Sequence, residues 1–361
     1  MRIAIDAREL AGHVTGVGRY LAELLKAWNE SPHAHQYEFV LLAHKPLALP
    51  PLPKLRIVDQ VHAGAGGTLW EQLVLPKLVR QARADVLFAP AYTAPLTAPV
   101  PVVVTVHDVS FCAHSEWFSW REGLRRRLVT RRSAHAAAKV LTVSRFSRDE
   151  IVRFLGIPAS RVQVIYSGPS AVVATPGPPE SGRRLILYVG SVLARRHVLE
   201  LVDGFARLTR RRPDVHLAIV GDPRGVPPVD VGAHVRAAGL DQQVTVRGYV
   251  TDAELATLYG QAAAFAFLSS YEGFGLTPLD AIAAGIPTVV LDTPVAREIY
   301  GDAAHRVAAP EPLLVEAALE RVLFDPAERT RLAEAGRALA ERYTWAASGR
   351  ETLAALTGAA R

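Results

Sequence analysis

Two acidic residues in a glycine-containing segment are the clearest candidates for chemistry in this chain. Residues 269–281 read Ser-Ser-Tyr-Glu-Gly-Phe-Gly-Leu-Thr-Pro-Leu-Asp-Ala, which places Glu272 and Asp280 eight positions apart. The segment follows an apolar run and opens a helical pattern, so its glycines present backbone N–H groups to an anion at a helix start. Carboxylates beside such a loop indicate a ligand that carries hydroxyl groups as well as phosphate.

Two adjacent arginines supply the matching positive charge. Arg195 and Arg196 follow Gly190, which ends another apolar strand, and they open the next helix. A guanidinium forms paired hydrogen bonds with phosphate oxygens, so these two side chains could clamp a diphosphate. The alternative is that both lie on a helix surface in solvent, like the arginines at 210–212.

A pair of glycines and a histidine in the first half of the chain are further candidates. Gly16, Val17 and Gly18 lie between the first apolar strand and a helical pattern, where missing side chains let a phosphate or sugar approach the backbone. The third glycine of a dinucleotide fingerprint is missing, so a simple tight turn is the alternative. His107 ends a valine-rich strand, from which its imidazole could reach a sugar; a packing or helix-capping histidine is the alternative.

Apolar, β-branched runs alternate with helical patterns along the whole chain and must position these residues. The runs cover residues 2–6, 37–43, 55–59, 85–89, 102–106, 139–143 and 162–165, and then 185–189, 215–220, 243–246, 263–268, 287–291 and 305–308. Such runs predict parallel sheets that are buried on both faces. We therefore expect an α/β fold of two facing, Rossmann-like, doubly wound domains, with ligand sites at the carboxyl ends of the strands and a cleft between the domains.

A stretch rich in proline and glycine divides the two series of strands. It predicts a linker over residues 171–183. The first domain then covers residues 1–170 and is joined by a C-terminal helix at 344–361, and the second covers residues 184–343. The length of 361 residues agrees with two domains of roughly 150–200 residues each.

The composition limits the compartment and the classes of partner. The single cysteine, Cys112, excludes an intrachain disulfide, and the chain starts with a strand pattern in place of a signal peptide, which together predict a cytoplasmic protein. No apolar run reaches the roughly 20 residues that span a bilayer. The net charge of +6 admits nucleic acid, anionic lipid or phosphorylated ligands, and charge alone does not choose among them.

With these residues in place, the chain resembles the retaining glycosyltransferases of group 1, the GT4-like enzymes of GT-B architecture. The signature of that family is an acidic residue, seven others and a second acidic residue, as in Glu272 and Asp280. Six further segments look like family landmarks in the same order: residues 15–20, 106–108, 142–147, 190 with 195–196, 248–250 and 343–345. The chain departs from the family in having Asp280 where glutamate is usual, and Arg-Arg-His at 195–197 where Arg-Lys-Asn is usual.

The resemblance implies a role for each candidate residue. Glu272 would hold hydroxyls of the donor sugar, Arg195 and Arg196 the diphosphate, and Asp280 the ribose, while residues 248–250 would meet the base. The implied catalytic residues are His107, Arg195, Arg196 and Glu272, and the implied donor-binding residues are Gly16, Val17, Gly18, Gly190, Gly248, Tyr249, Val250, Gly273, Phe274, Gly275, Leu276, Thr277 and Asp280. The second domain would bind the nucleotide sugar, and the first would lie on the acceptor side.

The implied activity is that of a retaining hexosyltransferase, with a mannosyltransferase favoured. The donor would be a nucleotide diphosphate sugar, with GDP-mannose favoured and a UDP-sugar open, and the acceptor a hydroxyl of a glycan or lipid-linked molecule in cell-surface polysaccharide synthesis. We expect no cofactor and no metal site, because the chain contains no Asp-x-Asp motif and arginines can neutralise the diphosphate. The alternatives are a nucleotide-sugar epimerase and a non-catalytic nucleotide-sugar-binding protein of the same fold. Nucleic acid is not expected, because it would leave the two carboxylates unexplained.

A basic helical pattern over residues 117–132 points to a further partner. One stripe carries Trp117, Trp120, Leu124 and Leu128, and six arginines surround it. Such a helix could lie on an anionic membrane, which would make the protein peripheral on the inner membrane face and bring it to a lipid-linked acceptor. The alternative is that the stripe packs on the sheet of its own domain.

Overall fold

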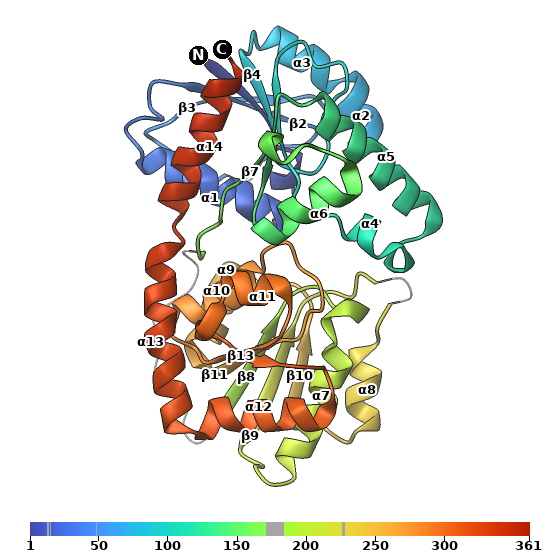
Figure 1. Ribbon diagram of the computed structural model, residues 1–361, viewed down its shortest axis with the longest axis vertical. Helices are drawn as coiled ribbons and strands as arrows, with labels where there is room; N and C mark the ends of the chain where they lie inside the picture. Colours follow the sequence, from blue (N-terminus) through green and yellow to red (C-terminus); the bar gives the residue numbers. More distant parts are fainter. Residues whose placement is uncertain (13, 15, 48, 171–183, 226–227) are drawn as a thin grey trace. The chain divides into compact units, whose positions relative to one another are not determined.

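A computed structural model of the chain (Figure 1) describes residues 1–361 apart from 13, 15, 48, 171–183 and 226–227. The described residues divide into two compact units. Unit 1 comprises Met1–Ser167 and Thr344–Arg361, and unit 2 comprises Gly168–Tyr343. The linker predicted at 171–183 lies outside the described residues.

Unit 1 is built on a sheet of seven parallel strands. The strands are β1 (Arg2–Asp6), β2 (Glu38–Ala43), β3 (Arg56–Val61), β4 (Val86–Ala89), β5 (Val102–Thr105), β6 (Lys139–Thr142) and β7 (Val162–Val164), in the order β3-β2-β1-β4-β5-β6-β7. The connecting helices are η1 (Arg8–Leu10), α1 (Val17–Glu30), α2 (Gly67–Leu73), α3 (Leu75–Gln81), α4 (Ser110–Ala113), η2 (Ser115–Trp117), α5 (Trp120–Ala136), α6 (Arg145–Leu155) and η3 (Ala159–Arg161). The last helix of the chain, α14 (Trp345–Ala359), completes unit 1.

Unit 2 repeats this plan with six parallel strands. The strands are β8 (Arg184–Val189), β9 (Val215–Val220), β10 (Val244–Arg247), β11 (Ala262–Phe267), β12 (Thr288–Leu291) and β13 (His305–Val307), in the order β10-β9-β8-β11-β12-β13. The helices are η4 (Ala194–Arg196), α7 (Val198–Thr209), α8 (Val231–Ala237), α9 (Asp252–Gln261), α10 (Leu276–Ala283), α11 (Pro294–Ile299), η5 (Gly301–Ala303), α12 (Pro312–Phe324) and α13 (Pro326–Arg342). The prediction of two doubly wound parallel-sheet domains is confirmed.

Both sheets reverse their strand order beside the first strand of the unit. In unit 1 the chain passes from β1 outward to β3 and returns to β4, next to β1, and in unit 2 it passes from β8 outward to β10 and returns to β11, next to β8. Loops that follow two such neighbouring strands leave in opposite directions, which opens a crevice at the carboxyl edge where ligands bind in folds of this class.

Alternating side chains bury both faces of the sheet of unit 1. Phe39 lies under Trp28 of α1, with their rings stacked at 5.1 Å, whereas its neighbour Val40 packs in the core on the opposite face with Trp70 and Leu75. This alternation follows from the two-residue period of a strand. Helix α14 packs beside α1, where the indole N–H of Trp28 donates to the carbonyl of Gly349 at 2.8 Å.

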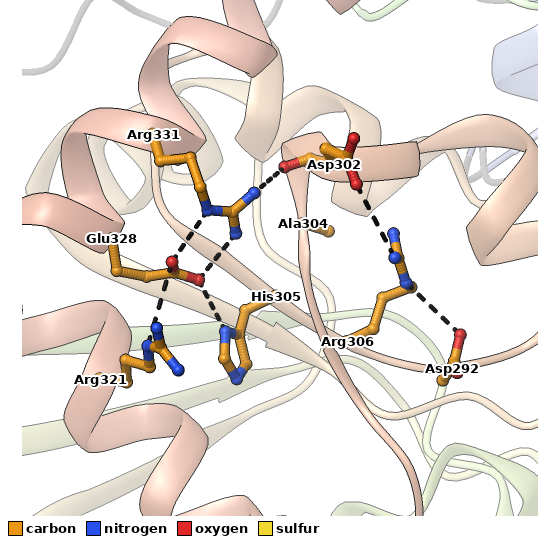
Figure 2. A pocket seen from close by; sticks show the side chains of 8 residues that line it. All are labelled: Asp292, Asp302, Ala304, His305, Arg306, Arg321, Glu328 and Arg331. Carbon is orange, nitrogen blue, oxygen red and sulfur yellow. Dashed lines mark hydrogen bonds and ion pairs between the residues drawn. The ribbon is translucent and has the colours of Figure 1, made fainter.

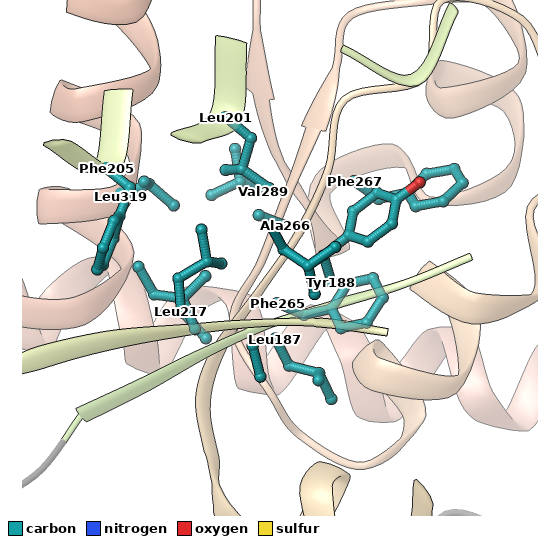
Figure 3. Packing of buried hydrophobic residues seen from close by; sticks show 14 of the residues in the cluster. Leu187, Tyr188, Leu201, Phe205, Leu217, Phe265, Ala266, Phe267, Val289 and Leu319 are labelled. Carbon is teal, nitrogen blue, oxygen red and sulfur yellow. The ribbon is translucent and has the colours of Figure 1, made fainter. Parts of the chain in front are cut away.

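Aromatic residues of β8 and β11 form the centre of the core of unit 2 (Figure 3). The ring of Tyr188 stacks on Phe267 at 5.7 Å, and Phe265 stacks on Tyr259 at 5.8 Å. Helices α7 and α12 cover the neighbouring strands and approach closely at Gly204, where a Cβ atom would lie only 2.5 Å from Cγ1 of Val315. Each fully buried large apolar side chain contributes about 1.5–3 kcal/mol, so this core makes a large share of the stability of the unit.

The basic helical pattern predicted over residues 117–132 is partly wrong in its bounds. Trp117 ends the short turn η2, and α5 begins only at Trp120. The sharp change of direction at Phe118 and Ser119, whose backbones are extended, separates the two elements. Across the described part of the chain, no helix combines the length and the apolar composition needed to cross a membrane.

A network of charged side chains fastens α13 to β13 around a surface hollow of about 380 Å³ (Figure 2). The carboxylate of Glu328 is 5% exposed and lies 2.7 Å from Nδ1 of His305 and 2.8 Å from the Arg331 guanidinium. Hydrogen bonds from Arg331, and then from His305, lower the pKa of Glu328 from 4.5 to about 2.

Replacing Glu328 by glutamine is expected to lower the free energy of unfolding by about 2 kcal/mol at neutral pH, allowing for solvent screening of the half-exposed Arg331. Because the folded-state pKa is depressed, this stabilisation is present above pH 4.5 and is lost as the pH falls toward about 2. Urea unfolding of both proteins from neutral to acidic pH measures the difference. Glu334→Gln, at an exposed site on the same helix, is the control. A loss for Glu328→Gln that stays constant with pH would contradict the assignment.

Candidate functional site

Arg196 and Glu272 meet at the carboxyl edge of the sheet of unit 2. Nε of Arg196 lies 2.8 Å from Oε1 of Glu272, and the two side chains are 15% and 16% exposed. They are 76 positions apart in the chain. Because β8 and β11 are neighbours, the loops that follow them bring the two residues together.

The surroundings hold this ion pair in one geometry. The hydroxyl of Ser269 donates to Oε1 of Glu272 at 2.9 Å, and Arg196 donates to the carbonyl of Ser191 at 3.1 Å. The guanidinium lies over the ring of Phe267, 5.0 Å from its centroid. Gly190 leaves room for it, because a Cβ there would lie 2.9 Å from Nη1 of Arg196.

Burial disfavours the charged form of Arg196, and the neighbouring side chains favour it. Burial by itself lowers the pKa of the guanidinium, but the charge of Glu272 and the contact with Tyr188 more than offset this, so the pKa of Arg196 is raised overall. Arg196 therefore keeps its full positive charge inside the site. The two loops are also joined through the backbone, since the N–H of Ser270 donates to the carbonyl of Arg195 at 2.9 Å.

The glycine loop leads into helix α10, whose first backbone amides lie at the start of the helix. Gly275 is the N-cap residue, with a φ of 87° that favours glycine, and among the described residues no side chain caps the helix. Leu276 and Thr277 form its first turn and are partly exposed. Phe274 is buried and packs edge-on against Tyr343 at 5.9 Å. The first amides of α10 are thus suited to an anion such as a phosphate.

Asp280 is held more deeply than the sequence suggested. It is 1% exposed, and its Oδ1 accepts a hydrogen bond from the backbone N–H of Ser170 at 2.6 Å. The short aspartate side chain keeps this carboxylate against α10. The predicted contact of Asp280 with the ribose stays a prediction.

The predicted base-binding residues follow the edge strand β10. Gly248 packs against Asp222, whose Oδ1 would lie 2.8 Å from a Cβ at 248. Tyr249 is 47% exposed and Val250 is partly buried. The strand order places these residues two strands away from β8, so they share the carboxyl edge with Arg196 without belonging to its immediate cluster.

In unit 1, His107 lies after β5 in a buried aromatic setting. Its Nε2 lies 2.8 Å from the carbonyl oxygen of Pro90, and its ring packs edge-on against Tyr20 at 4.9 Å. A carbonyl only accepts, so Nε2 carries the proton and Nδ1 of the neutral ring is an acceptor. Burial lowers the pKa of His107, which keeps the ring neutral at neutral pH. His107 is therefore suited to accept a hydrogen bond from a hydroxyl group.

Gly16 and Gly18 have separate reasons to be glycine. Gly16 is the N-cap of α1 with a φ of 47°, a conformation that other residues seldom adopt. Gly18 is buried, and a Cβ there would lie 2.2 Å from the carbonyl oxygen of Glu9. A turn thus accounts for Gly16 and close packing for Gly18, and their predicted contact with the donor stays a prediction. Val17, between them, is partly buried in the first turn of α1.

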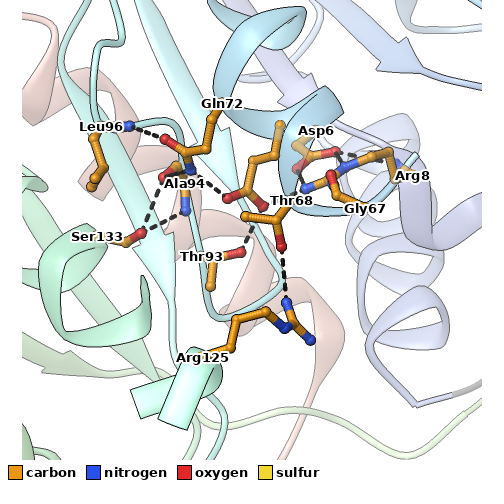
Figure 4. Close-up of polar contacts among 11 residues, drawn as sticks. Asp6, Arg8, Gly67, Thr68, Gln72, Thr93, Ala94, Leu96, Arg125 and Ser133 are labelled. Carbon is orange, nitrogen blue, oxygen red and sulfur yellow. Dashed lines mark hydrogen bonds and ion pairs between the residues drawn. The ribbon is translucent and has the colours of Figure 1, made fainter. Parts of the chain in front are cut away.

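Sequence reasoning missed a polar cluster at the carboxyl edge of unit 1 (Figure 4). Arg8 forms a two-point hydrogen bond with Asp6, and its Nη2 lies 2.6 Å from a carboxylate oxygen of Glu71. Thr93 donates to the same oxygen of Glu71 at 2.6 Å. Asp6 and Glu71 are each 3% exposed. The one local signal was Asp6, a charged residue at the end of the first apolar strand.

Tyr92 is a second missed residue, and it is strained. Its φ of 66° is unusual for a residue other than glycine, and its hydroxyl donates to Asp108 at 2.9 Å. Positive φ costs about 1–3 kcal/mol and persists where surrounding contacts enforce it, often at functional sites. Within the described ranges, no group of three or more His, Cys, Asp or Glu side chains is placed to hold a metal ion.

Each of the two units matches a model of a known protein family. Residues 14–169 match the model of Glycosyltransferase Family 4, and residues 176–339 match that of Glycosyl transferases group 1. The chain is 26% identical over 372 aligned residues to O-antigen chain mannosyltransferase B of Escherichia coli, with 96% of each chain covered.

One further relative has a nucleotide sugar in its name, and one solved structure has a similar fold. The chain is 27% identical over 204 residues to a GDP-mannose:cellobiosyl-diphosphopolyprenol alpha-mannosyltransferase of Xanthomonas campestris, covering 56% of this chain and 52% of that one. The crystal structure of Anabaena Alr3699/HepE in complex with UDP and glucose is similar with a TM-score of 0.74 at 19% identity, covering 99% of this chain and 100% of that one. At that identity the structural likeness shows the fold alone.

The buried ion pair predicts strong coupling between its two residues. Arg196→Met leaves Glu272 without its charge partner and is expected to cost about 3–5 kcal/mol of unfolding free energy. Adding Glu272→Gln should recover a large part of that loss, because the buried charge is then gone. Chemical denaturation of the wild type, both single variants and the double variant gives the coupling energy. The same cycle on the more exposed pair Arg211 and Glu320, 2.9 Å apart, should give less than about 1 kcal/mol. Simple additivity at Arg196 and Glu272 would contradict the structure.

Proposed function

The chain belongs to the GT4-like, group 1 glycosyltransferases of GT-B architecture, and we propose that it transfers a hexose, with retention, from a nucleotide diphosphate sugar to a hydroxyl of a glycan or lipid-linked acceptor. The names of the relatives in Escherichia coli and Xanthomonas campestris favour mannose as the sugar and GDP as the nucleotide. A UDP-sugar is the second candidate donor, because residues 248–250 do not distinguish guanine from uracil. Cell-surface polysaccharide synthesis is the setting that the first relative suggests.

The pairing of Arg196 with Glu272 beside the uncapped start of α10 is the observation that carries this proposal. A guanidinium and the amides of a helix start together suit a diphosphate, and a carboxylate next to them suits the hydroxyls of the sugar that the diphosphate carries. In the proposed complex Arg195 and Arg196 hold the diphosphate, and Glu272 holds the sugar. A nucleic-acid ligand would place Glu272 against its own phosphates, which the charges oppose.

In the proposed reaction the acceptor oxygen forms a bond with the anomeric carbon as the bond from that carbon to the diphosphate breaks. Both events take place on the same face of the sugar, and the acceptor's proton passes to the leaving phosphate oxygen. Arg195, Arg196 and the first amides of α10 stabilise the charge that develops on the diphosphate. His107, neutral and with Nδ1 available as an acceptor, would orient a sugar hydroxyl.

Nucleotide release from GDP-mannose and UDP-sugars, with and without acceptor glycans, tests this proposal. Arg196→Lys, which weakens a donor to the diphosphate, and Glu272→Gln, which removes the charge of the acceptor for the sugar hydroxyls, are each expected to lower kcat by about 10²–10³, the size of effect seen when one preorganised hydrogen-bonding group is lost. Arg211→Lys, at an exposed site on unit 2, should leave the rate unchanged. Sugar inversion without nucleotide release would indicate an epimerase, and donor binding without turnover a binding protein.

Metal independence is part of the proposal and has its own test. Since Arg195 and Arg196 are proposed to neutralise the diphosphate, removal of divalent ions with EDTA should leave nucleotide release within about twofold of the untreated rate. Activity lost in EDTA and restored by Mn²⁺ would overturn this part alone.

We also propose that α5 docks on an anionic membrane that carries the acceptor. Trp120, Leu124 and Leu128 are 71%, 45% and 44% exposed, so the alternative in which this stripe packs on its own sheet is wrong for these three residues. Four arginines of α5 are exposed around the stripe: Arg121, Arg125, Arg131 and Arg132. Arg125 also donates to Thr68 of α2, a helix on which Leu69 and Leu73 are 76% and 61% exposed. Apolar and basic side chains side by side suit the interface of an anionic bilayer.

Cosedimentation with phosphatidylglycerol vesicles tests the docking surface. Binding should weaken with salt, and removing one arginine near the surface (Arg121→Gln) should weaken it about fivefold, since each such charge adds about 1 kcal/mol. Trp120→Glu with Leu124→Glu should abolish it, whereas Leu313→Glu, at a 62% exposed leucine on unit 2, should not. Equal binding to uncharged phosphatidylcholine vesicles, or none at low salt, would overturn the proposal.

A further inference from the structure

A buried tyrosine outside the predicted site contacts the glycine loop. Tyr300 follows helix α11 as its C-cap residue and is 4% exposed. Its hydroxyl oxygen lies 2.8 Å from the carbonyl oxygen of Gly275 and 3.1 Å from that of Phe274. One hydroxyl thus lies within hydrogen-bond distance of two consecutive peptide carbonyls at the start of α10.

This contact sets the direction of the amides on the other side of the same peptides. In a trans peptide the carbonyl and the following N–H point in opposite directions. Because the carbonyls of Phe274 and Gly275 face Tyr300, the N–H groups of Gly275 and Leu276 point away from it. Gly275 is left-handed, with φ 87° and ψ 73°, and is followed by the right-handed helix, a succession in which neighbouring N–H groups can form an anion-binding concavity.

The hydroxyl group of Tyr300 occupies the space that a side chain at position 275 would need. A Cβ at position 275 would lie 1.9 Å from the hydroxyl oxygen of Tyr300. Glycine is therefore required here by the close approach of the hydroxyl as well as by its φ value. Burial, and then the charges of Glu272 and Asp280, raise the pKa of Tyr300 well above its usual value, so the hydroxyl keeps the proton that it donates.

We propose that Tyr300 is a positioning residue of the donor site, which orients the N–H groups of Gly275 and Leu276 toward the diphosphate of the donor. This inference rests on the proposed function, because it takes the glycine loop as the diphosphate site. In this proposal Tyr300 acts through the loop and makes no contact with the donor itself. Its removal should weaken recognition of the phosphates and leave recognition of the nucleoside unchanged.

The test compares a nucleoside diphosphate with the matching nucleoside. Calorimetry or NMR titration measures binding of GDP and guanosine, and of UDP and uridine, to the full chain and to Tyr300→Phe, which keeps the ring and removes only the hydroxyl. We expect the affinity for the diphosphate to fall at least tenfold and that for the nucleoside to change less than twofold. The KM for the donor should rise in step with the loss of diphosphate affinity.

Tyr343→Phe is the matched control. Tyr343 is also buried, and its hydroxyl lies 3.4 Å from the carbonyl of Glu298, while its ring, which the variant keeps, packs against Phe274. This variant loses a buried hydroxyl of the same kind and should keep the ratio of the two affinities. If Tyr300→Phe does not fold, Gly275→Ala tests the contact from the loop side, since its Cβ displaces the hydroxyl, and the same phosphate-specific loss is expected.

The outcomes separate the two proposals. An unchanged ratio in a folded Tyr300 or Gly275 variant, or an equal loss for nucleoside and diphosphate, would overturn the role of Tyr300 and leave the proposed function standing. Failure of the unmodified chain to bind any of the four probes would overturn both.

Discussion

The buried ion pair between Arg196 and Glu272 is the interaction on which the candidate site of unit 2 depends. Two charges that leave water are tolerated only when each finds a partner and the remaining hydrogen bonds are made. The structure meets this condition with Ser269 on the carboxylate and with the ring of Phe267 under the guanidinium. The pair joins the loops after β8 and β11.

The glycines of these loops are explained by the same pair and its neighbours. Gly190 makes room for the guanidinium, and Gly275 makes room for the hydroxyl of Tyr300. In both places a side chain from another segment fills the volume that a Cβ would need. The loops are thus held by their surroundings, which suits a site that must present backbone donors in a set direction.

Unit 1 also holds charged side chains with little exposure to water, here one arginine and two carboxylates. Arg8 lies between Asp6 and Glu71 at the carboxyl edge of the sheet, and Thr93 supplies a further hydrogen bond. The two carboxylates together carry one more negative charge than the single positive charge of Arg8 balances. On the surface of the unit, by contrast, apolar side chains are exposed: the tryptophan and leucines of α5 lie in solvent among arginines.

The sequence by itself determined the succession of strands and helices along the chain and the loops that carry polar residues. Local periodicity and the position of glycine encode these features, because they depend on residues only a few positions apart. It also pointed to Arg196 and Glu272 as a charged pair of candidates. Only the tertiary structure decided that they touch, since a contact across 76 positions depends on strand order. The backbone of Ser170 on Asp280, the hydroxyl of Tyr300 on the glycine loop and the exposure of Trp120 were likewise decided by packing between distant segments, which no local pattern records.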